Sequence, residues 1–175
     1  DVVLRVASRG VVRLVSYLIR KSLGWCDENG DPIESQHFCS RHDLVHKVGI
    51  SEGSIKKTIQ EALDRNFIEV VIDGRPHRTG ELGHSSLYRL RYDEPDAPYC
   101  SVAEQFKGFF SGEGHYLPCP DVFHDSIVRH EKLSVVQVVG AVLRNTVGFR
   151  VESGFRRQQA PVSVGDICKL FDMSR

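Results

Sequence analysis

The stretch SRHDLVHKVGIS, residues 40–51, contains the local signals for two helices joined by a tight turn. Ser40 can cap a helix, and Asp43 places a carboxylate in the first turn, where the amides are free. Gly49 can adopt the left-handed conformation that ends a helix, and Ser51 can cap the next one. The stretch therefore predicts a helix-turn-helix unit.

A later stretch, SVGDICKLFDMS (163–174), repeats the same unit. Ser163 takes the place of the first cap, Asp166 that of the first-turn carboxylate and Ser174 that of the second cap. Asp172 stands where the first stretch has glycine, which is compatible because Asp visits the left-handed region more readily than most residues.

The residues before each unit also match. LVSYLIRKSLGW (14–25) and VVGAVLRNTVGF (138–149) share an apolar stripe at helical spacing and the ending Arg-x-x-x-Gly-aromatic. In the second copy this stripe comprises Val138, Val139, Val142, Leu143 and Val147. Because the matches occur in the same order in both halves, we interpret the chain as a tandem duplication.

The first copy continues as a complete winged helix. SEGSIKKTIQEALDRN (51–66) predicts an amphipathic recognition helix, FIEVVID (67–73) and SLYRLRY (86–92) predict two strands, and the Gly-studded residues 74–85 join them as a hairpin wing. The apolar face of the helix would comprise Ile55, Ile59, Ala62 and Leu63.

The predicted fold class is mainly α with small β-hairpin wings (α+β), arranged as tandem winged helix-turn-helix units. We expect a first winged-helix domain at 1–95, a linker with a short helix (102–110) at 96–119, and a second winged-helix domain at 120–175. The second domain opens with a lead-in helix at 121–132 and is incomplete, because the sequence stops where its recognition helix would start.

The composition indicates an ordinary globular protein of 175 residues, with 41% hydrophobic residues, 26% charged residues and zero formal net charge. No apolar run approaches the roughly 20 residues of a membrane-spanning helix, and no secretory leader precedes Asp1. Five cysteines without regular spacing fit reduced thiols better than a disulfide framework. We therefore expect a cytoplasmic protein without a membrane partner.

Positive charge concentrates in two segments of this neutral chain. Residues 74–91 hold four arginines against one glutamate, and so do residues 144–159. Cations near a duplex neutralise phosphates, while the start of a recognition helix meets base edges or backbone. The residues predicted to bind DNA are Ser51, Ser54, Lys56, Lys57, Arg75, His77, Arg78, Arg156, Arg157, Ser174 and Arg175.

Other kinds of site are poorly supported. DENGDPIE (27–34) has part of a calcium-loop spacing but Pro32 where glycine is required, and HFCSRHDLVH (37–46) lacks the second Cys pair of a zinc finger. No nucleophile or phosphate-loop motif is present. We expect no enzyme, no metal and no cofactor.

The second half resembles the amino-terminal winged-helix region of phage and plasmid replication initiators, of the replication protein O type and its replisome-organiser relatives. The matching residues are Pro120, Asp125, Arg144, Gly148, Phe149, Ser163 and Ser174, and LIRKSLGW with the residue 40–71 region matches the same pattern in the first half. The resemblance implies binding to origin repeats in double-stranded DNA and recruitment of replication proteins such as a helicase or its loader.

Two alternatives to an initiator stay open. A transcriptional regulator would use the same motif equally well. A winged-helix interaction scaffold of a replisome or partition complex would fit the neutral charge and the acidic Glu52, Glu61 and Asp64 on the recognition helix. An incomplete second copy leaves apolar surface that a second chain could cover, so a homodimer is an alternative to a monomer.

Overall fold

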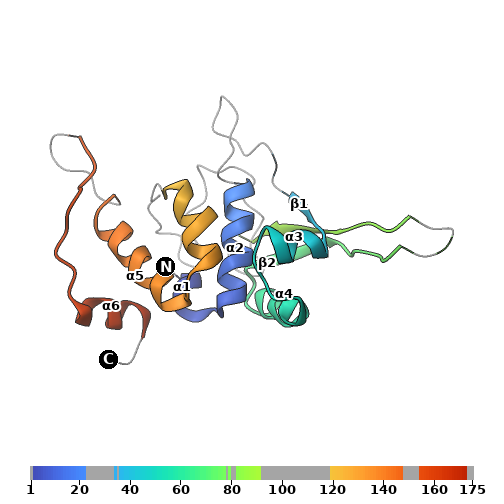
Figure 1. Ribbon diagram of the computed structural model, residues 1–175, viewed down its shortest axis with the longest axis horizontal. Helices are drawn as coiled ribbons and strands as arrows, with labels where there is room; N and C mark the ends of the chain where they lie inside the picture. Colours follow the sequence, from blue (N-terminus) through green and yellow to red (C-terminus); the bar gives the residue numbers. More distant parts are fainter. Residues whose placement is uncertain are drawn as a thin grey trace.

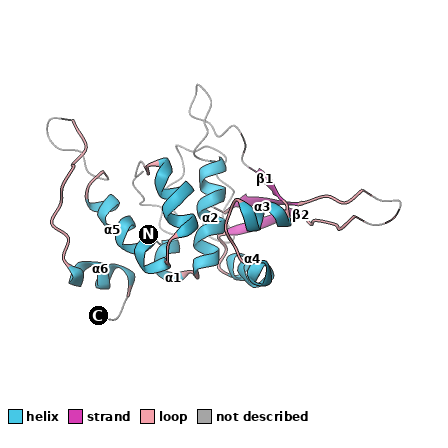
Figure 2. Ribbon diagram, in the orientation of Figure 1, coloured by secondary structure: helices cyan, strands magenta, loops and turns pink. Residues whose placement is uncertain are grey.

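Both repeated units fold as helices in the computed structural model, which describes residues 2–22, 34, 36–77, 79, 82–91, 119–147 and 154–172. Figure 1 and Figure 2 show a helical body from which a β-hairpin projects. The α+β class is confirmed, and the tandem winged-helix assignment stays a prediction. In chain order the elements are α1 (Val2–Val6), α2 (Arg9–Ser22), β1 (Gln36–Cys39), α3 (Arg41–His46), η1 (Glu52–Ser54), α4 (Ile55–Asp64), β2 (Ile68–Ile72), β3 (Ser86–Leu90), η3 (Phe123–Val128), α5 (Leu133–Asn145) and α6 (Val164–Phe171).

The predicted helix caps at Ser40 and Ser163 are confirmed. The amide of Asp43 donates to Ser40 Oγ at 3.1 Å, and the amide of Ser40 donates to Asp43 Oδ2 at 3.0 Å. Ser163 and Asp166 form the same reciprocal pair at the start of α6, with 3.1 Å for both bonds. Each pair satisfies two amides that would otherwise lack a partner at the helix start.

The two predicted left-handed positions are also confirmed. Gly49 has φ +82° and Asp172 has φ +54°. At Gly49 a second constraint applies, because a Cβ built there would lie 3.2 Å from the carbonyl oxygen of Arg129, a residue of the second half. Glycine is therefore favoured both by the backbone conformation and by close contact with a distant segment.

The sheet contains the two expected strands and one that was not expected from the sequence. β2 and β3 confirm the strands predicted at 67–73 and 86–92, and they pair antiparallel with a register shift between Val70 and Ile72. β1, only four residues long, pairs antiparallel with the other edge of β3. The strand order is therefore β1-β3-β2.

The buried core lies between α2, α4 and the sheet. Its largest fully buried side chains include Leu14 and Leu18 of α2, Phe67 before β2, and Leu90 of β3. Burying a side chain of this kind contributes about 1.5–3 kcal/mol, so this cluster is the main source of stability in the first half.

The described part of the second half joins this same core. The expected lead-in helix is present and contains the π-helix η3, which packs against α2. Phe123, Val128 and Val136 belong to one continuous cluster with the apolar residues of α2. The division into domains at 1–95 and 120–175 stays a prediction, and the short helix expected at 102–110 lies outside the described residues.

α5 uses a different face from the one that the duplicated stripe predicts. Val138 and Val142 are 40% and 42% exposed, while Val136, Gly140 and Ala141 are buried. The side-chain amide of Gln137 also donates to the backbone oxygen of Leu4 at 2.8 Å, which draws the buried face toward α1. The predicted stripe is therefore buried only in part.

None of the helices in the described ranges is long and apolar enough to cross a membrane. The cytoplasmic location stays a prediction.

We expect Gly49→Ala to lower the free energy of unfolding by at least about 1 kcal/mol, because alanine is strained at positive φ and its Cβ would crowd Arg129. Urea denaturation monitored by circular dichroism measures this change. Gly53→Ala is the matched control: its added Cβ meets no atom within 4 Å, so stability should stay equal or rise slightly. Equal changes in the free energy of unfolding for Gly49→Ala and Gly53→Ala would contradict the role assigned to glycine at position 49.

Candidate nucleic-acid interface

The predicted recognition helix presents one face to the core and the other to solvent. Thr58 and Ala62 are buried, and the predicted apolar residues Ile55, Ile59 and Leu63 pack against the core, as expected. The opposite face is exposed and carries Lys56, Lys57, Gln60 and Asp64. A helix that is open along one side can enter a DNA major groove.

The position of α4 is fixed by close contacts with α2. Gly10 allows Thr58 to approach α2 closely, because a Cβ at residue 10 would collide with the Thr58 hydroxyl. The amide of Ser8 donates to Glu61 Oε1 at 2.9 Å. Glu61 thereby holds the helix in place, and its carboxylate is turned toward the protein.

Ser51 and Ser54, two of the serines predicted to contact DNA, bond to each other. Ser54 Oγ donates to the backbone oxygen of Ser51 at 2.9 Å, and the two hydroxyl oxygens lie 2.6 Å apart. Ser51 is exposed and begins η1, but its side chain does not cap that helix as the sequence predicted. The two hydroxyls therefore stabilise the turn through their contact with each other and with the Ser51 carbonyl.

Two of the acidic residues on this helix are paired with arginines. Glu52 lies 2.9 Å from Arg41, and Glu61 lies 3.4 Å from Arg65. No ion pair joins Lys56 or Lys57 to another residue within the described ranges. The charges of Glu52 and Glu61 are therefore partly offset by their partners, while Asp64 is exposed on the same face as Lys56 and Lys57.

The hairpin extends well beyond the sheet and exposes part of the predicted basic wing (Figure 1). Arg75 pairs with His84 as an isolated antiparallel bridge, and Arg75 and His77 are both exposed. Glycine at position 83 is required there, because a Cβ would collide with the backbone of His77. Arg78 lies outside the described residues.

Two other arginines counted in the basic wing belong to the sheet instead. Arg89 forms a cross-strand ion pair with Glu69, and Arg91 donates to Asn66 Oδ1 at 3.2 Å. The charge of Arg89 is therefore paired within the sheet, and among the described wing arginines Arg75 is the one with an exposed side chain.

The second basic segment is far from the hairpin. Residues 154–163 lie at one end of the longest axis of the molecule and the hairpin lies at the other (Figure 1). Arg156 donates to the backbone oxygen of Val147 at 3.1 Å, and Arg157 is exposed. The structure does not bring these arginines together with the residues on α4, and Ser174 and Arg175 lie outside the described residues.

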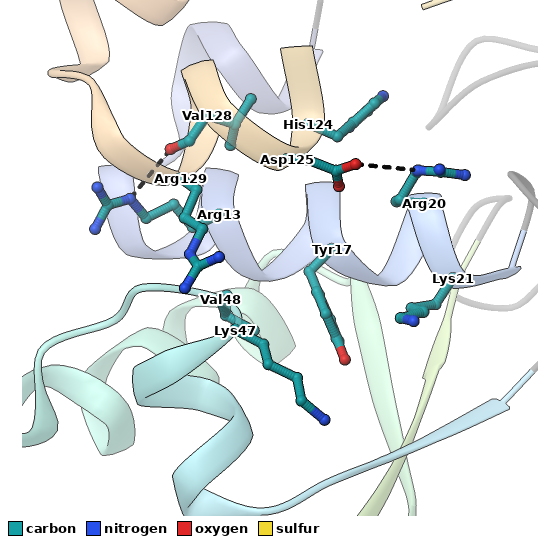
Figure 3. A pocket seen from close by; sticks show the side chains of 10 residues that line it. All are labelled: Arg13, Tyr17, Arg20, Lys21, Lys47, Val48, His124, Asp125, Val128 and Arg129. Atoms are coloured by element: carbon teal, nitrogen blue, oxygen red, sulfur yellow. Dashed lines mark hydrogen bonds and ion pairs between the residues drawn. The ribbon is translucent and has the colours of Figure 1, made fainter. Parts of the chain in front are cut away.

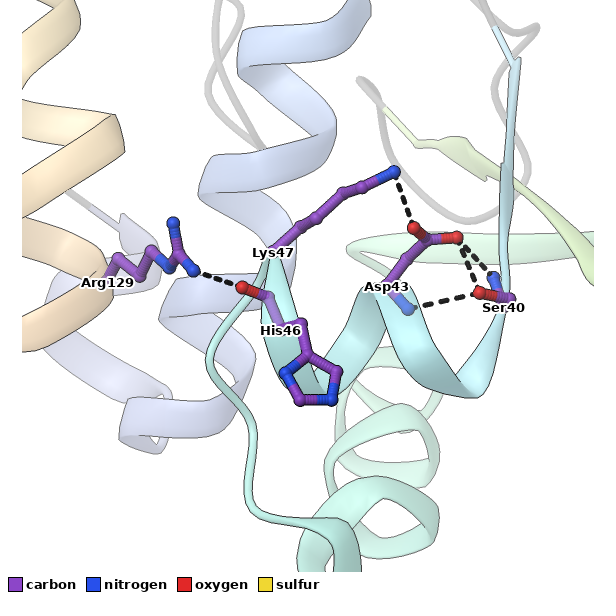
Figure 4. A network of polar contacts seen from close by, with 5 residues as sticks. All are labelled: Ser40, Asp43, His46, Lys47 and Arg129. Atoms are coloured by element: carbon purple, nitrogen blue, oxygen red, sulfur yellow. Dashed lines mark hydrogen bonds and ion pairs between the residues drawn. The ribbon is translucent and has the colours of Figure 1, made fainter.

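The turn before η1 and α4 is held by arginines from both halves, and these contacts were not expected from the sequence. Arg13 of α2 donates to the backbone oxygens of Gly49 and of Val128, the latter at 3.1 Å. Arg129 donates to the backbone oxygen of His46 (Figure 4). These bonds connect the end of η3 to the helix-turn-helix unit, and only a three-dimensional arrangement could reveal them.

The same turn contains a charged network around Asp43. Lys47 Nζ lies 2.6 Å from Asp43 Oδ1, and Ser40 Oγ donates to Asp43 Oδ2 at 2.6 Å (Figure 4). The hydrogen bonds from Lys47 and Ser40 lower the pKa of Asp43 to about 2. The carboxylate is therefore charged at every physiological pH.

The histidines and the cysteine of the 37–46 segment are arranged differently from a metal site. Burial raises the pKa of the Cys39 thiol to about 12, so it is not a thiolate at neutral pH. The rings of His42 and His46 stack with centroids 4.3 Å apart. Within the ranges that the structure describes, no group of three or more His, Cys, Asp or Glu side chains could hold a metal ion.

Comparison of the chain with protein-family models, with curated proteins and with solved structures gave no match. Function must therefore be argued from the residues and geometry above.

We expect Asp43→Asn to destabilise the protein at neutral pH and to have little effect near pH 2. The folded-state pKa of Asp43 is depressed to about 2, so its charge stabilises the folded state fully above the unfolded value of about 4 and progressively less below it. Urea denaturation of both proteins from pH 7 down to pH 2 measures the difference.

Asp166→Asn should show the same kind of pH dependence, because hydrogen bonds from Ser163 also lower the pKa of Asp166. Its difference from the unmodified protein should shrink as the pH falls. A stability difference for Asp43→Asn that stays constant across the pH range would assign its effect to packing and not to charge.

Proposed function

We propose that this chain binds double-stranded DNA through the η1–α4 helix and the β2–β3 hairpin of its first half, acting as a winged helix. Its biological role would be that of a plasmid or phage type replication initiator. A regulator of transcription is the nearest alternative within the same class.

The order of elements supports a winged helix. A long helix, a short strand, two helices joined by a tight turn, and a hairpin follow one another as α2, β1, α3, α4, β2 and β3. The strand order β1-β3-β2 places the hairpin next to the short strand that precedes the helix-turn-helix unit. This arrangement leaves one face of α4 free and the hairpin beside it.

The single observation that carries the proposal is the exposed cationic face of α4 beside an exposed hairpin. Lys56 and Lys57 have exposed side chains without an ion pair to a described residue, and Arg75 and His77 are exposed on the hairpin. A helix in the major groove with a hairpin on the adjacent backbone would let all four reach phosphates or base edges.

The initiator role is supported only by the resemblance of sequence motifs. Two elements that carry part of this resemblance, the lead-in helix with Asp125 and the capped helix after Ser163, are both formed. Locating the bound sites distinguishes the two roles: repeats within a replication origin support an initiator, and a promoter operator supports a regulator.

A protein-interaction scaffold is the second candidate, and exposed apolar side chains favour it. Leu82 on the hairpin is 90% exposed, and Phe38 on the edge strand β1 is 58% exposed. An edge strand with an exposed aromatic residue offers both backbone groups and apolar surface to a partner. The neutral net charge is also compatible with a scaffold.

We expect the chain to bind a 30-base-pair duplex with an affinity that falls steeply as salt rises. The triple variant Lys56→Ala, Lys57→Ala and Arg75→Ala should bind more weakly and should reduce the slope of log K against log[salt] by about one for each phosphate that is no longer neutralised. Fluorescence anisotropy at a series of salt concentrations measures both quantities.

The control is the double variant Lys132→Ala and Lys169→Ala, which removes exposed lysines away from α4 and the hairpin. It should leave the slope unchanged. Absence of binding at low salt, or identical slopes for the triple variant and the unmodified protein, would reject the DNA proposal in favour of the scaffold.

A further inference from the structure

A cationic cavity of about 220 Å³ lies between α2, the turn after α3, and η3 (Figure 3). It is separate from the exposed face of α4, since no residue of α4 or of the hairpin lines it. Its walls combine residues of the two halves of the chain, so it exists only because η3 packs on α2. The charged residues that line it are Arg13, Arg20, Lys21, Lys47, Asp125 and Arg129.

Cations outnumber carboxylates around this cavity. Of the six charged residues in its walls, five are basic. Asp125 and Asp121 lie 3.9 Å and 3.0 Å from Arg20, and Asp43 lies 2.6 Å from Lys47. Even when these three carboxylates are all counted, the cations exceed them by two, in a chain whose net charge is zero.

The excess charge belongs to cations that are not paired with these carboxylates. Arg13 and Arg129 direct their guanidinium groups to backbone oxygens. Lys21 lies with its Nζ 5.9 Å from the Tyr17 ring centroid, and it forms no ion pair with a residue in the described ranges. A backbone oxygen offsets only part of a full positive charge, so the cavity retains a positive potential.

Burial is the main cause of the lowered pKa values in the cavity walls, and positive neighbours add to it. The pKa of Arg13 is lowered, first by burial and then by the positive charges of Arg9 and Arg129. Burial, with a further contribution from Arg20, lowers the pKa of His124, so this wall residue is neutral at pH 7. The positive charge of the cavity at neutral pH therefore comes from arginine and lysine alone.

We propose that the cavity binds a phosphate group, as inorganic phosphate, as pyrophosphate or as the phosphate of a larger ligand whose remainder lies outside. Arg and Lys donors grouped around one space match a multiply charged oxyanion. The volume is below the roughly 300 Å³ of pockets that enclose whole drug-sized ligands, which favours a small anion. This inference goes beyond the proposed DNA contact, because the site uses α2, the turn and η3.

A bound phosphate would connect the two halves of the chain. Lys47 lies just after α3, Lys21 lies near the end of α2, and Arg129 follows η3. An anion in the cavity would be attracted by the cations of all three segments and would favour the packing of η3 against the turn. Binding would therefore stabilise the folded protein in proportion to the logarithm of ligand concentration.

Titration calorimetry with sodium pyrophosphate at constant ionic strength tests the proposal on the whole chain. We expect one binding site per chain, and an affinity about tenfold lower in Lys21→Gln and in Lys47→Gln, since each removes a charged hydrogen-bond donor. Lys132→Gln, an exposed lysine outside the cavity, is the matched control and should bind as the unmodified protein does. Circular dichroism of each variant establishes that it is folded.

The proposal would be overturned if calorimetry detected no heat of binding up to 10 mM pyrophosphate or phosphate. It would also be overturned if the unmodified protein and the three variants bound pyrophosphate with equal affinity, because the anion would then bind elsewhere. Competition with duplex DNA identifies the source of the phosphate. If DNA displaces pyrophosphate and Lys21→Gln also weakens DNA binding, the cavity takes a backbone phosphate. If pyrophosphate and duplex DNA bind independently, the cavity takes a free ligand. This result does not depend on the proposed DNA contact, so it would hold even if the Lys56, Lys57 and Arg75 triple variant bound DNA as the unmodified protein does.

Discussion

Two arginines that donate to the backbone oxygens of His46 and Gly49 hold the turn that leads into α4. A helix end leaves carbonyl groups without partners, and side-chain cations commonly satisfy them. Here Arg129 donates to the carbonyl oxygen of His46 at the end of α3. Arg13 donates both to the carbonyl oxygen of Gly49 in the turn and to that of Val128 in η3. Arg9 similarly donates to the carbonyl of His130, at 3.0 Å. The turn that leads into α4 is therefore held by residues of the second half as well as by its own sequence.

Features set by neighbouring residues could be predicted from the sequence. The caps at Ser40 and Ser163, the left-handed Gly49 and Asp172, and the buried side of α4 each follow from interactions within a few residues. The strand β1 could not be predicted in this way, because its four residues acquire strand structure by pairing with β3, some fifty positions later. The cavity could not be predicted for the same reason: its cations come from three separated segments and are ordinary surface residues when each is considered alone.

Charge counts along the sequence were less informative than charge pairs in space. The acidic residues of the recognition helix, which by count oppose DNA binding, include Glu52 and Glu61, and these are paired with Arg41 and Arg65. Conversely, Arg89 of the basic wing is paired with Glu69 in the sheet. In both cases the effective charge depends on the residue that lies next to it in space. A count of charged residues along a stretch of sequence does not include that information. A net charge of zero is therefore compatible with separate positive surfaces on the folded protein.

The two copies of the repeated unit have the same local signals but different packing. α2 is covered by α4, by the sheet and by η3, whereas α5 contacts α1, α6 and η3 and leaves Val138 and Val142 exposed. Gly140 faces Leu4 closely enough that an added Cβ would lie 3.0 Å from its Cδ1, so α5 is adapted to α1 and not to a second sheet. A duplicated sequence pattern specifies helices and caps, but packing depends on what surrounds them. This difference favours a division of roles, in which the first copy carries the helix that we propose binds DNA, while the second copy supports the preceding turn through η3 and Arg129.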